Sequence, residues 1–228
     1  MKKIIVCVLA FFLLLAGCSV GDSSSIPQNR EVLPYENDST FGVWISFSEI
    51  NAMLKSEDGF KTEFDKAVEN CKALKIGEIY VHIRPYCDSL YKSDYFPLTK
   101  AAKDIDFDAF QYILNACHTA GIKVHAWINP YRVQTSSSDI ESLDPESPAY
   151  KWLSDESAEI DNNVSIYNGI YLNPAEPEVR ELVINGIREV LDKYEVDGIH
   201  FDDYFYPTAD PEFDSLSYEK YKSETENP

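Results

Sequence analysis

The sequence predicts an α/β fold of the (β/α)8 TIM-barrel type, of which the chain supplies the first four β/α units. Three observations lead to this prediction. Four short apolar segments have the composition of buried strands, amphipathic helical patterns lie between them, and polar side chains gather just after the strand ends. Strand–helix–strand repetition implies parallel strands joined by right-handed crossovers.

The four predicted strands are short, rich in β-branched and aromatic residues, and bounded by Gly or Pro. They are "FGVWISF" (41–47), "GEIYVHIRP" (77–85), "IKVHAWINP" (122–130) and "VDGIHFDD" (196–203). Near-continuous apolar runs of this kind are typical of parallel strands that are covered on both faces.

Three helices are predicted between the strands, over 59–75, 106–121 and 173–194, because apolar residues recur there at three- and four-residue steps. Gly121 stands where the second of these helices should stop. A doubly wound sheet would also fit this alternation. However, "ISFSEINAML" follows the first strand in place of a glycine-rich phosphate loop, which disfavours a nucleotide-binding fold.

The number of strands sets an expectation about the extent of the chain. A complete barrel needs eight units and about 250 residues, and only four predicted strands precede Pro228. We therefore expect a half barrel over 40–228, either a truncated product or a chain completed by another one. An exposed flank of parallel strands should be unstable alone.

The N-terminus has the features of an export signal. Lys2 and Lys3 precede the apolar "IIVCVLAFFLLL", and "LAGC" ends at Cys18, which resembles the lipobox of bacterial lipoproteins. The prediction is a signal peptide over 1–17, a lipid on Cys18, and a flexible linker over 18–39. The alternative is an ordinary secretory signal with a chance cysteine. Either way the protein should be exported, and with the lipid it would be anchored to the bacterial cell membrane, facing the extracytoplasmic side.

Charge and cysteine content exclude some classes of protein. The formal net charge of −19 argues against binding nucleic acid. Cys71, Cys87 and Cys117 are widely spaced and odd in number, so we expect buried free thiols and no metal-binding cysteine pattern. The tyrosine-rich composition suits carbohydrate contact, and it equally suits a dense core.

Two-residue alternation along each strand assigns the polar side chains to one face. Polar or small side chains share a face opposite the aliphatic ones in the last three strands: His82 and Arg84; His125, Trp127 and Asn129; Gly198, His200 and Asp202. Polar residues facing inward at the mouth of a barrel are typical of an active site.

The segments "VHIRPYCDSLYKSDYFP", "HAWINPYRV", "GIYLNPAEPEVRELVINGIREVL" and "DGIHFDDYFYP" resemble the signature segments of the family-10-like glycosyl hydrolase domain. The resemblance covers about residues 40–207. It implies a bacterial, exported β/α barrel that acts on a glycan, such as the glycan strands of peptidoglycan, without a metal or other cofactor. Cys87 is a departure, because members usually carry a small residue there.

Carried over motif by motif, the resemblance implies a catalytic pair and a set of substrate-binding residues. Asp202 is the leading catalytic candidate, because G-x-H-x-D also resembles the G-x-R-x-D of amylase-type barrels, whose aspartate is the nucleophile. Asp203 would orient a sugar hydroxyl or hold Arg84. The implied substrate-binding residues are Arg84, Asp88, His125, Trp127, Asn129, Arg132, Asn173, His200, Tyr204 and Tyr206.

Each of these residues also has a purely structural interpretation. Asp202 and Asp203 could cap a turn, Asp88 and Asn129 could form turns, and the histidines and Trp127 could be core residues. Three functions remain open: a glycoside hydrolase, a non-catalytic glycan-binding lipoprotein, and a metal-dependent amidohydrolase or deacetylase using His82, His125, His200 and Asp202. Glycoside hydrolysis needs two carboxyl groups. In amylase-like barrels the second is a glutamate on the strand after the fourth, and no such strand is predicted before Pro228. Only Asp88 or Asp203 could replace it, so we expect residues 19–228 alone to be inactive or impaired.

Overall fold

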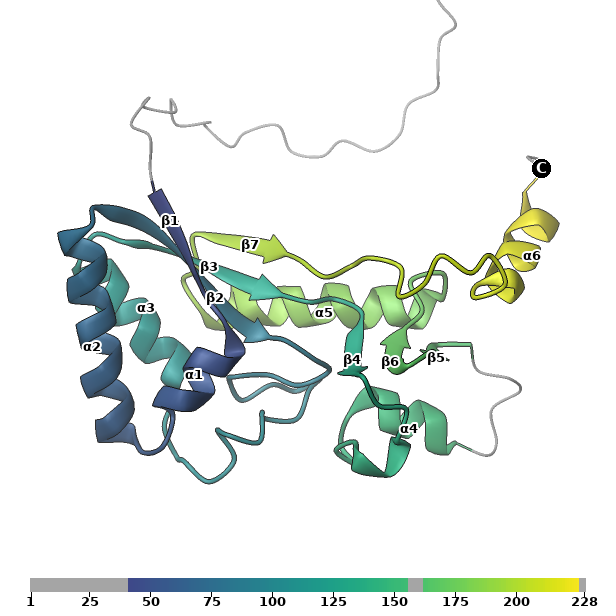
Figure 1. Ribbon diagram of the computed structural model, residues 1–228, viewed down its shortest axis with the longest axis horizontal. Coiled ribbons are helices and arrows are strands. Elements are labelled where there is room, and N and C mark those ends of the chain that lie inside the picture. Colours follow the sequence, from purple (N-terminus) through teal and green to yellow (C-terminus); the bar gives the residue numbers. More distant parts are fainter. Residues whose placement is uncertain (1–40, 156–161, 226–228) are drawn as a thin grey trace, which may run out of the picture. The chain divides into compact units, whose positions relative to one another are not determined.

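The computed structural model describes residues 41–155 and 162–225, which form a parallel four-stranded sheet and a smaller antiparallel sheet (Figure 1). The parallel sheet has the order β1-β2-β3-β7. Its strands are β1 (Phe41–Ile45), β2 (Ile76–Arg84), β3 (Lys123–Ile128) and β7 (Gly198–Phe201). All four predicted strands and their parallel pairing are thus confirmed. The part of the sheet that the structure describes is open, and the expected half barrel stays a prediction.

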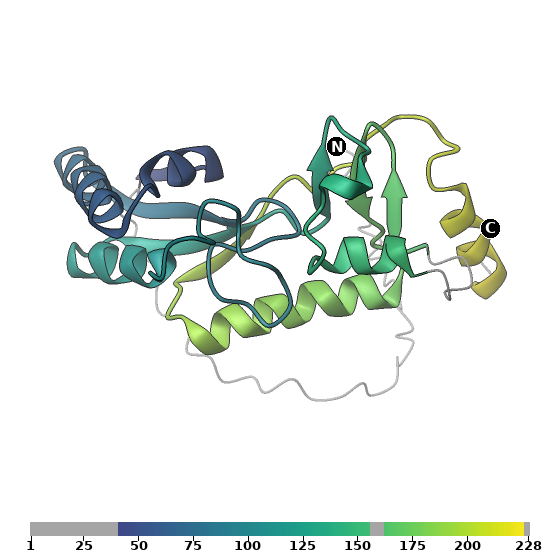
Figure 2. The same cartoon turned by 90° about the horizontal axis from the view of Figure 1, so that it is seen from below.

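Helices cover the aliphatic face of this sheet (Figures 1 and 2). They are α1 (Phe47–Met53), α2 (Glu57–Ala73), α3 (Ala109–Thr119) and α5 (Pro177–Lys193), and α2, α3 and α5 are the helices predicted from periodicity. Polar caps fix their starts. The Ser56 side chain accepts a hydrogen bond from the Gly59 N–H at the start of α2, and Asp108 does the same for Gln111 at the start of α3.

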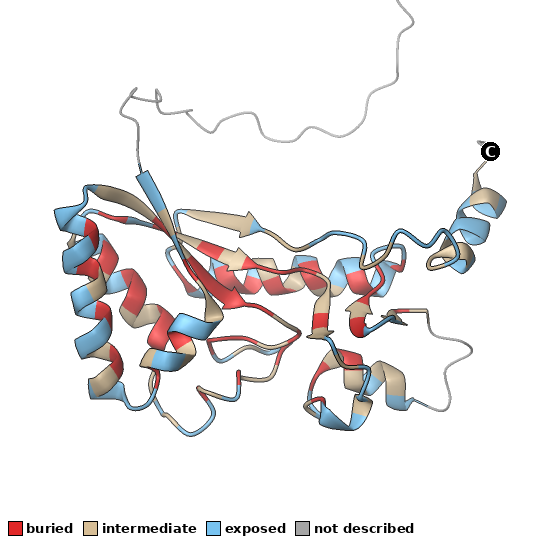
Figure 3. Ribbon diagram, in the orientation of Figure 1, coloured by how far each residue is buried: buried red, intermediate tan, exposed pale blue. Residues whose placement is uncertain are grey.

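The main core lies between this face of the sheet and α2 and α3 (Figure 3). Ile79, Val81 and Ile83 of β2 are fully buried, as are Phe60 and Phe64 of α2. The opposite face of the sheet carries aromatic and histidine side chains instead. The two faces therefore differ in chemistry as the two-residue alternation predicts.

The second sheet was not expected, because no strand was predicted between the third predicted strand and the helix over 173–194. It has the order β4-β6-β5, with antiparallel pairs, and consists of β4 (Arg132–Thr135), β5 (Val164–Ile166) and β6 (Gly169–Leu172). A short 3-10 helix (Ile140–Ser142) and α4 (Pro148–Ser154) complete this region. Val133, Ala149, Ile170 and Leu172 form its own small core with Val179 of α5.

The last described helix, α6 (Ser215–Glu224), has no buried residue. Polar contacts hold it. Lys220 forms an ion pair with Glu176 at 2.8 Å, and the Ser217 hydroxyl accepts a hydrogen bond from the Asn173 amide at 3.0 Å.

Cys71, Cys87 and Cys117 are free and buried, as predicted. The predicted signal peptide, Cys18 and the whole of the predicted linker lie outside the described residues. Within the described ranges, no helix has the length and apolar composition needed to cross a membrane.

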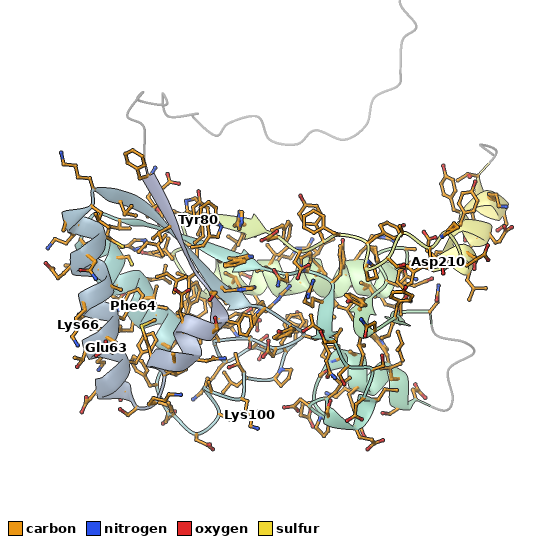
Figure 4. All side chains as sticks on the ribbon, in the orientation of Figure 1. Glu63, Phe64, Lys66, Tyr80, Lys100 and Asp210 are labelled. Carbon is orange, nitrogen blue, oxygen red and sulfur yellow. The ribbon has the colours of Figure 1, made fainter. Side chains whose placement is uncertain are left out.

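Truncating Phe64 tests the packing of α2 on the sheet. Phe64 is fully buried and points toward the sheet, whereas Glu63 and Lys66 lie on the outer side of the helix (Figure 4). We expect Phe64→Ala to lower the free energy of unfolding by about 3–5 kcal/mol, because it removes apolar contacts and leaves a cavity. Lys66→Ala is the matched control and should change it by less than about 0.5 kcal/mol. Urea denaturation of both variants is the measurement, and equal effects would contradict the packing.

Candidate active site

A cavity of about 380 Å3 lies at the carboxyl ends of β2, β3 and β7, and we call it the Asp202 cavity. The position is the one at which parallel α/β sheets bind ligands, because their strand ends and following loops meet there. It is lined by Ser46, Phe47, His82, Tyr86, Trp127, Asn129, Arg132, Asp202, Asp203 and Phe205.

A stacked pair of rings forms one wall of this cavity. His82 of β2 and Trp127 of β3 are register neighbours, their ring centroids lie 3.7 Å apart, and their planes differ by 7°. Phe47 packs edge-on against His82. The pair presents a rigid aromatic surface, because each ring is held by a strand of the sheet.

Several polar atoms at this wall are buried and lack a hydrogen-bond partner in the described parts of the chain. Neither His82 ring nitrogen, nor the Trp127 indole N–H, nor the Asn129 Oδ1 has a hydrogen-bond partner among the residues that the structure describes. His82 is only 4% exposed. Burial lowers the pKa of His82 to about 4, and the nearby Asn129 and Asp202 side chains offset only part of this shift. Unpartnered buried polar groups are rare in folded proteins, so this cluster of them distinguishes the wall from the rest of the core.

Asp202 and Asp203 both line the cavity but differ in their contacts. The Asp202 N–H donates to the Ile128 carbonyl at 3.2 Å, and its carboxylate accepts a hydrogen bond from the Asp203 N–H at 2.8 Å. Asp203 has a φ of 53°, in the left-handed region, and its carboxylate pairs with the Arg132 guanidinium of β4. The Asp203 carboxylate is therefore compensated, whereas Asp202 has no cationic partner among the described residues.

The expectation that Asp203 could hold Arg84 was wrong. Arg84 is 1% exposed and lies over the Phe96 ring, with its guanidinium carbon 4.2 Å from the ring centroid, against Gly186 of α5. The pairing register of β2 with β3 shifts between His82 and Arg84. The alternation of side chains breaks at this irregularity, and Arg84 lies on the helix side of the sheet, away from the Asp202 cavity.

Asp88 does not meet Asp202 either. It lines a neighbouring cavity of about 640 Å3, which borders the Asp202 cavity at Tyr86. Burial raises the pKa of Asp88 to about 6, and its Oδ1 has no hydrogen-bond partner in the described parts of the chain. The arrangement therefore does not bring Asp88 and Asp202 together as an acid–base pair.

His125 and His200 do not line the cavity, although His200 is the register partner of Trp127. His125 stacks on Tyr80 with centroids 4.6 Å apart, and its Nε2 lies 3.4 Å from Glu78. The His200 Nε2 accepts a hydrogen bond from the Trp44 indole at 3.3 Å. These residues pack the aromatic face of the sheet, and Tyr80 marks that face in Figure 4.

The histidine-based metal site is not supported by these positions. Within residues 41–155 and 162–225, no three His, Cys, Asp or Glu side chains gather closely enough to hold a metal ion.

The remaining predicted residues divide between two cavities. Asn129 lines the Asp202 cavity, and its amide N–H2 donates to the Pro85 carbonyl at 3.0 Å. Asn173, Tyr204 and Tyr206 line a third cavity of about 230 Å3, next to Asp203. His82, Phe47 and Tyr86 are lining residues that were not among the predicted binding residues. His82 could have been predicted as a lining residue, because the two-residue alternation places it on the polar face of the sheet.

The chain has a parallel α/β sheet with carboxylates at its carboxyl edge beside a stacked aromatic wall, an arrangement compatible with a glycoside hydrolase-like protein. The chain belongs to the glycosyl hydrolase-like 10 family, whose model matches residues 40–228.

Two curated relatives are named as glycosyl hydrolases. The chain is 31% identical over 195 residues to glycosyl hydrolase YngK of Bacillus subtilis (strain 168), covering 78% of this chain and 36% of that protein. It is 29% identical over 167 residues to glycosyl hydrolase DigH of Escherichia coli (strain K12), covering 68% of this chain and 37% of that protein. The chain thus spans about a third of the length of these relatives.

Solved structures with local similarity include two carbohydrate-active enzymes. The α-L-fucosidase isoenzyme 2 of Paenibacillus thiaminolyticus is 21% identical, with a TM-score of 0.47 over 71% of this chain and 23% of that one. The maltogenic α-amylase AmyB of Thermotoga neapolitana is 14% identical, with a TM-score of 0.45 over 82% of this chain and 44% of that one. At these scores neither likeness defines the fold or the substrate.

The neutral, buried His82 predicts a specific dependence of stability on pH. Its pKa is about 4 in the folded protein against its usual 6.5, so between these values the unfolded chain binds more protons. Unfolding free energy therefore rises with pH across this window, and acidification from 6.5 to 4 removes up to about 3 kcal/mol. We expect His82→Phe, which keeps a ring against Trp127, to lack this component in urea denaturation at several pH values.

Asp88 provides a control, because its effect on the pH dependence of the unfolding free energy has the opposite sign. Its pKa is raised from 3.8 to about 6, so the folded protein binds more protons between these values and gains stability on acidification. Asp88→Asn should remove that gain. A pH profile of His82→Phe parallel to that of the unchanged protein would show that His82 is not kept neutral by burial.

Proposed function

We propose that this protein is a glycoside hydrolase of the cell envelope that cleaves O-glycosidic bonds in a glycan such as peptidoglycan. The observation that carries the proposal is the Asp202 cavity, in which two strand-end carboxylates lie beside the stacked rings of His82 and Trp127. Membership of the glycosyl hydrolase-like 10 family supports the class of reaction.

The different contacts of the two aspartates suggest different roles. Glycoside hydrolysis uses one carboxylate as a nucleophile or as a base for water, and one carboxylic acid that protonates the leaving oxygen. Asp202 has no cationic partner among the described residues, so its carboxylate can act on the anomeric carbon or on a water molecule beside it. Asp203 is bound to Arg132 and supports the loop.

The wall of the cavity suits a sugar ring. A pyranose has an apolar C–H face and a rim of hydroxyl groups. The aromatic rings that line the cavity can contact the apolar face, and the Asp202 carboxylate can accept a hydrogen bond from a hydroxyl group. The strongly acidic chain disfavours polyanionic polymers. Peptidoglycan as the particular glycan rests on the family resemblance and on the proposed location.

The location is part of the proposal. Lys2, Lys3, the apolar run after them and the "LAGC" motif ending at Cys18 support export and attachment of a lipid to Cys18. A lipid there would anchor the protein to the membrane on its extracytoplasmic side, next to the envelope glycan.

A non-catalytic glycan-binding protein is the second candidate. One observation favours it: of the described carboxylates that line the Asp202 cavity, Asp203 is engaged with Arg132, so Asp202 has no free carboxyl partner there. In that case the same cavity would bind a glycan and leave it intact.

Replacing Asp202 distinguishes the two candidates. In the full protein, Asp202→Asn should lower the release of reducing ends from peptidoglycan glycan strands by at least about a hundredfold, because the amide cannot act as a nucleophile or base. Binding of the same strands, followed by tryptophan fluorescence, should be kept. Asp192→Asn, at an exposed position of α5, is the matched control and should retain both properties.

The other outcomes are equally informative. Binding of the glycan by the unchanged protein without any release of reducing ends would favour the glycan-binding candidate. Unaltered cleavage and binding in Asp202→Asn would remove the Asp202 cavity from consideration as the active site.

A further inference from the structure

The third cavity, of about 230 Å3, lies between the second sheet and the segment that follows Asp203, and we call it the aromatic cavity. Six aromatic residues line it: Tyr131, Tyr171, Tyr204, Phe205, Tyr206 and Phe213. This density of rings exceeds what the local core requires, since Tyr204, Phe205 and Tyr206 are more than half exposed. Concave sites lined by aromatic side chains with a few polar groups are typical of ligand binding.

The aromatic cavity is contiguous with the Asp202 cavity. Asp203 and Phe205 line both of them. The left-handed conformation of Asp203 turns the chain between the two cavities, and its ion pair with Arg132 holds the turn. A ligand that fills one cavity can therefore continue past Asp203 into the other.

Hydrogen bonds make the polar wall of the aromatic cavity rigid. The Asn173 amide donates to the Asn162 carbonyl at 2.9 Å and to the Ser217 hydroxyl at 3.0 Å, and its oxygen accepts from the Ala175 N–H. Asn173 was predicted to bind substrate, but these bonds use its donors and acceptor to hold the wall. The Tyr206 hydroxyl is likewise occupied, by Asp214 at 2.7 Å.

Three tyrosine hydroxyl groups are left for a ligand. Tyr131 directly precedes β4, Tyr171 belongs to β6 and Tyr204 follows β7, and all three line the aromatic cavity. Unlike the Tyr206 hydroxyl, theirs form no side-chain hydrogen bond between described residues. Each can therefore contribute both a ring face and a hydrogen bond.

Charge and size limit the chemistry of the ligand. Asp203, Glu212 and Asp214 line the aromatic cavity, and the described lining residues include no lysine or arginine. An anionic ligand such as a phosphate would be repelled. The volume lies below the roughly 300–1,000 Å3 of pockets for drug-sized ligands, so a single small ring is the expected occupant.

We infer that the aromatic cavity is a subsite for a further sugar ring of the glycan bound at the Asp202 cavity. This inference rests on the proposed function and deepens it, because the substrate would then be a chain of linked sugar rings that spans both cavities past Asp203. Neutral rings with an apolar face and hydroxyl edges match both the stacking surfaces and the free tyrosine hydroxyl groups.

The test measures binding and does not depend on cleavage. In an Asp202→Asn background, isothermal titration is carried out with N-acetylglucosamine, chitobiose and chitotetraose, which are neutral probes made of linked sugar rings. We expect the affinity to increase with chain length. The double variant Tyr171→Ala/Phe213→Ala should bind chitotetraose about tenfold more weakly. Its affinity for N-acetylglucosamine should stay within about twofold of the value before these changes.

Two further variants keep the test interpretable. Tyr221→Ala, at a half-exposed position of α6, is the control for a general disturbance of this region and should leave all affinities unchanged. Tyr171→Phe removes only the hydroxyl group and should cause a smaller loss of affinity for chitotetraose. It replaces the alanine variants in the test if circular dichroism shows that these do not fold.

The outcomes separate this inference from the proposed function. Binding without a gain for longer chains, or an equal loss for all probes in the aromatic variants, would overturn the inference alone. Absence of binding of any probe to the folded protein, together with no cleavage by the unchanged protein, would overturn both.

Discussion

The ion pair between Arg132 and Asp203 is the interaction on which the rest of the site depends. It joins β4 of the second sheet to the residue that follows β7 of the parallel sheet. Asp203 has a left-handed backbone conformation, which is unfavourable for a residue with a Cβ and persists only where the surroundings hold it. The guanidinium supplies that hold and also compensates the Asp203 charge. As a result Asp202 faces one cavity while Tyr204 and Tyr206 line the next.

The parallel sheet gives the site its rigidity by using its two faces differently. Ile79, Val81 and Ile83 pack against the helices, where burial of apolar surface provides the stability. The other face carries a continuous set of ring contacts that ends in the His82–Trp127 stack. Because His82 stays neutral there, the stack places no positive charge beside Asp202. The hydrophobic core and the Asp202 cavity thus lie on opposite faces of the same strands.

The parallel sheet could be predicted from the sequence because each of its strands is an apolar run bounded by Gly or Pro, and α2, α3 and α5 have clear periodicity. The second sheet could not, since β5 has three residues and β4 and β6 have four each, too few to show an alternation. In β2, the two-residue alternation predicts the face of the sheet correctly up to His82. Arg84 departs from it at a register shift that depends on the pairing of β2 with β3. The partner of Asp203 was missed because the contact joins distant parts of the chain.

That distance has a consequence for how the molecule folds. Arg132 and Asp203 are 71 residues apart in the sequence, and β7 pairs with β3 across the whole second sheet and α5. Closing so long a loop carries an entropic cost that local helices such as α2 and α3 do not have to overcome, and non-local pairing slows folding. We expect β1, β2 and β3 with their helices to assemble first. During that interval the free edge of β3 would be exposed, so a chaperone or a rapid docking of β7 would protect it from pairing with another chain.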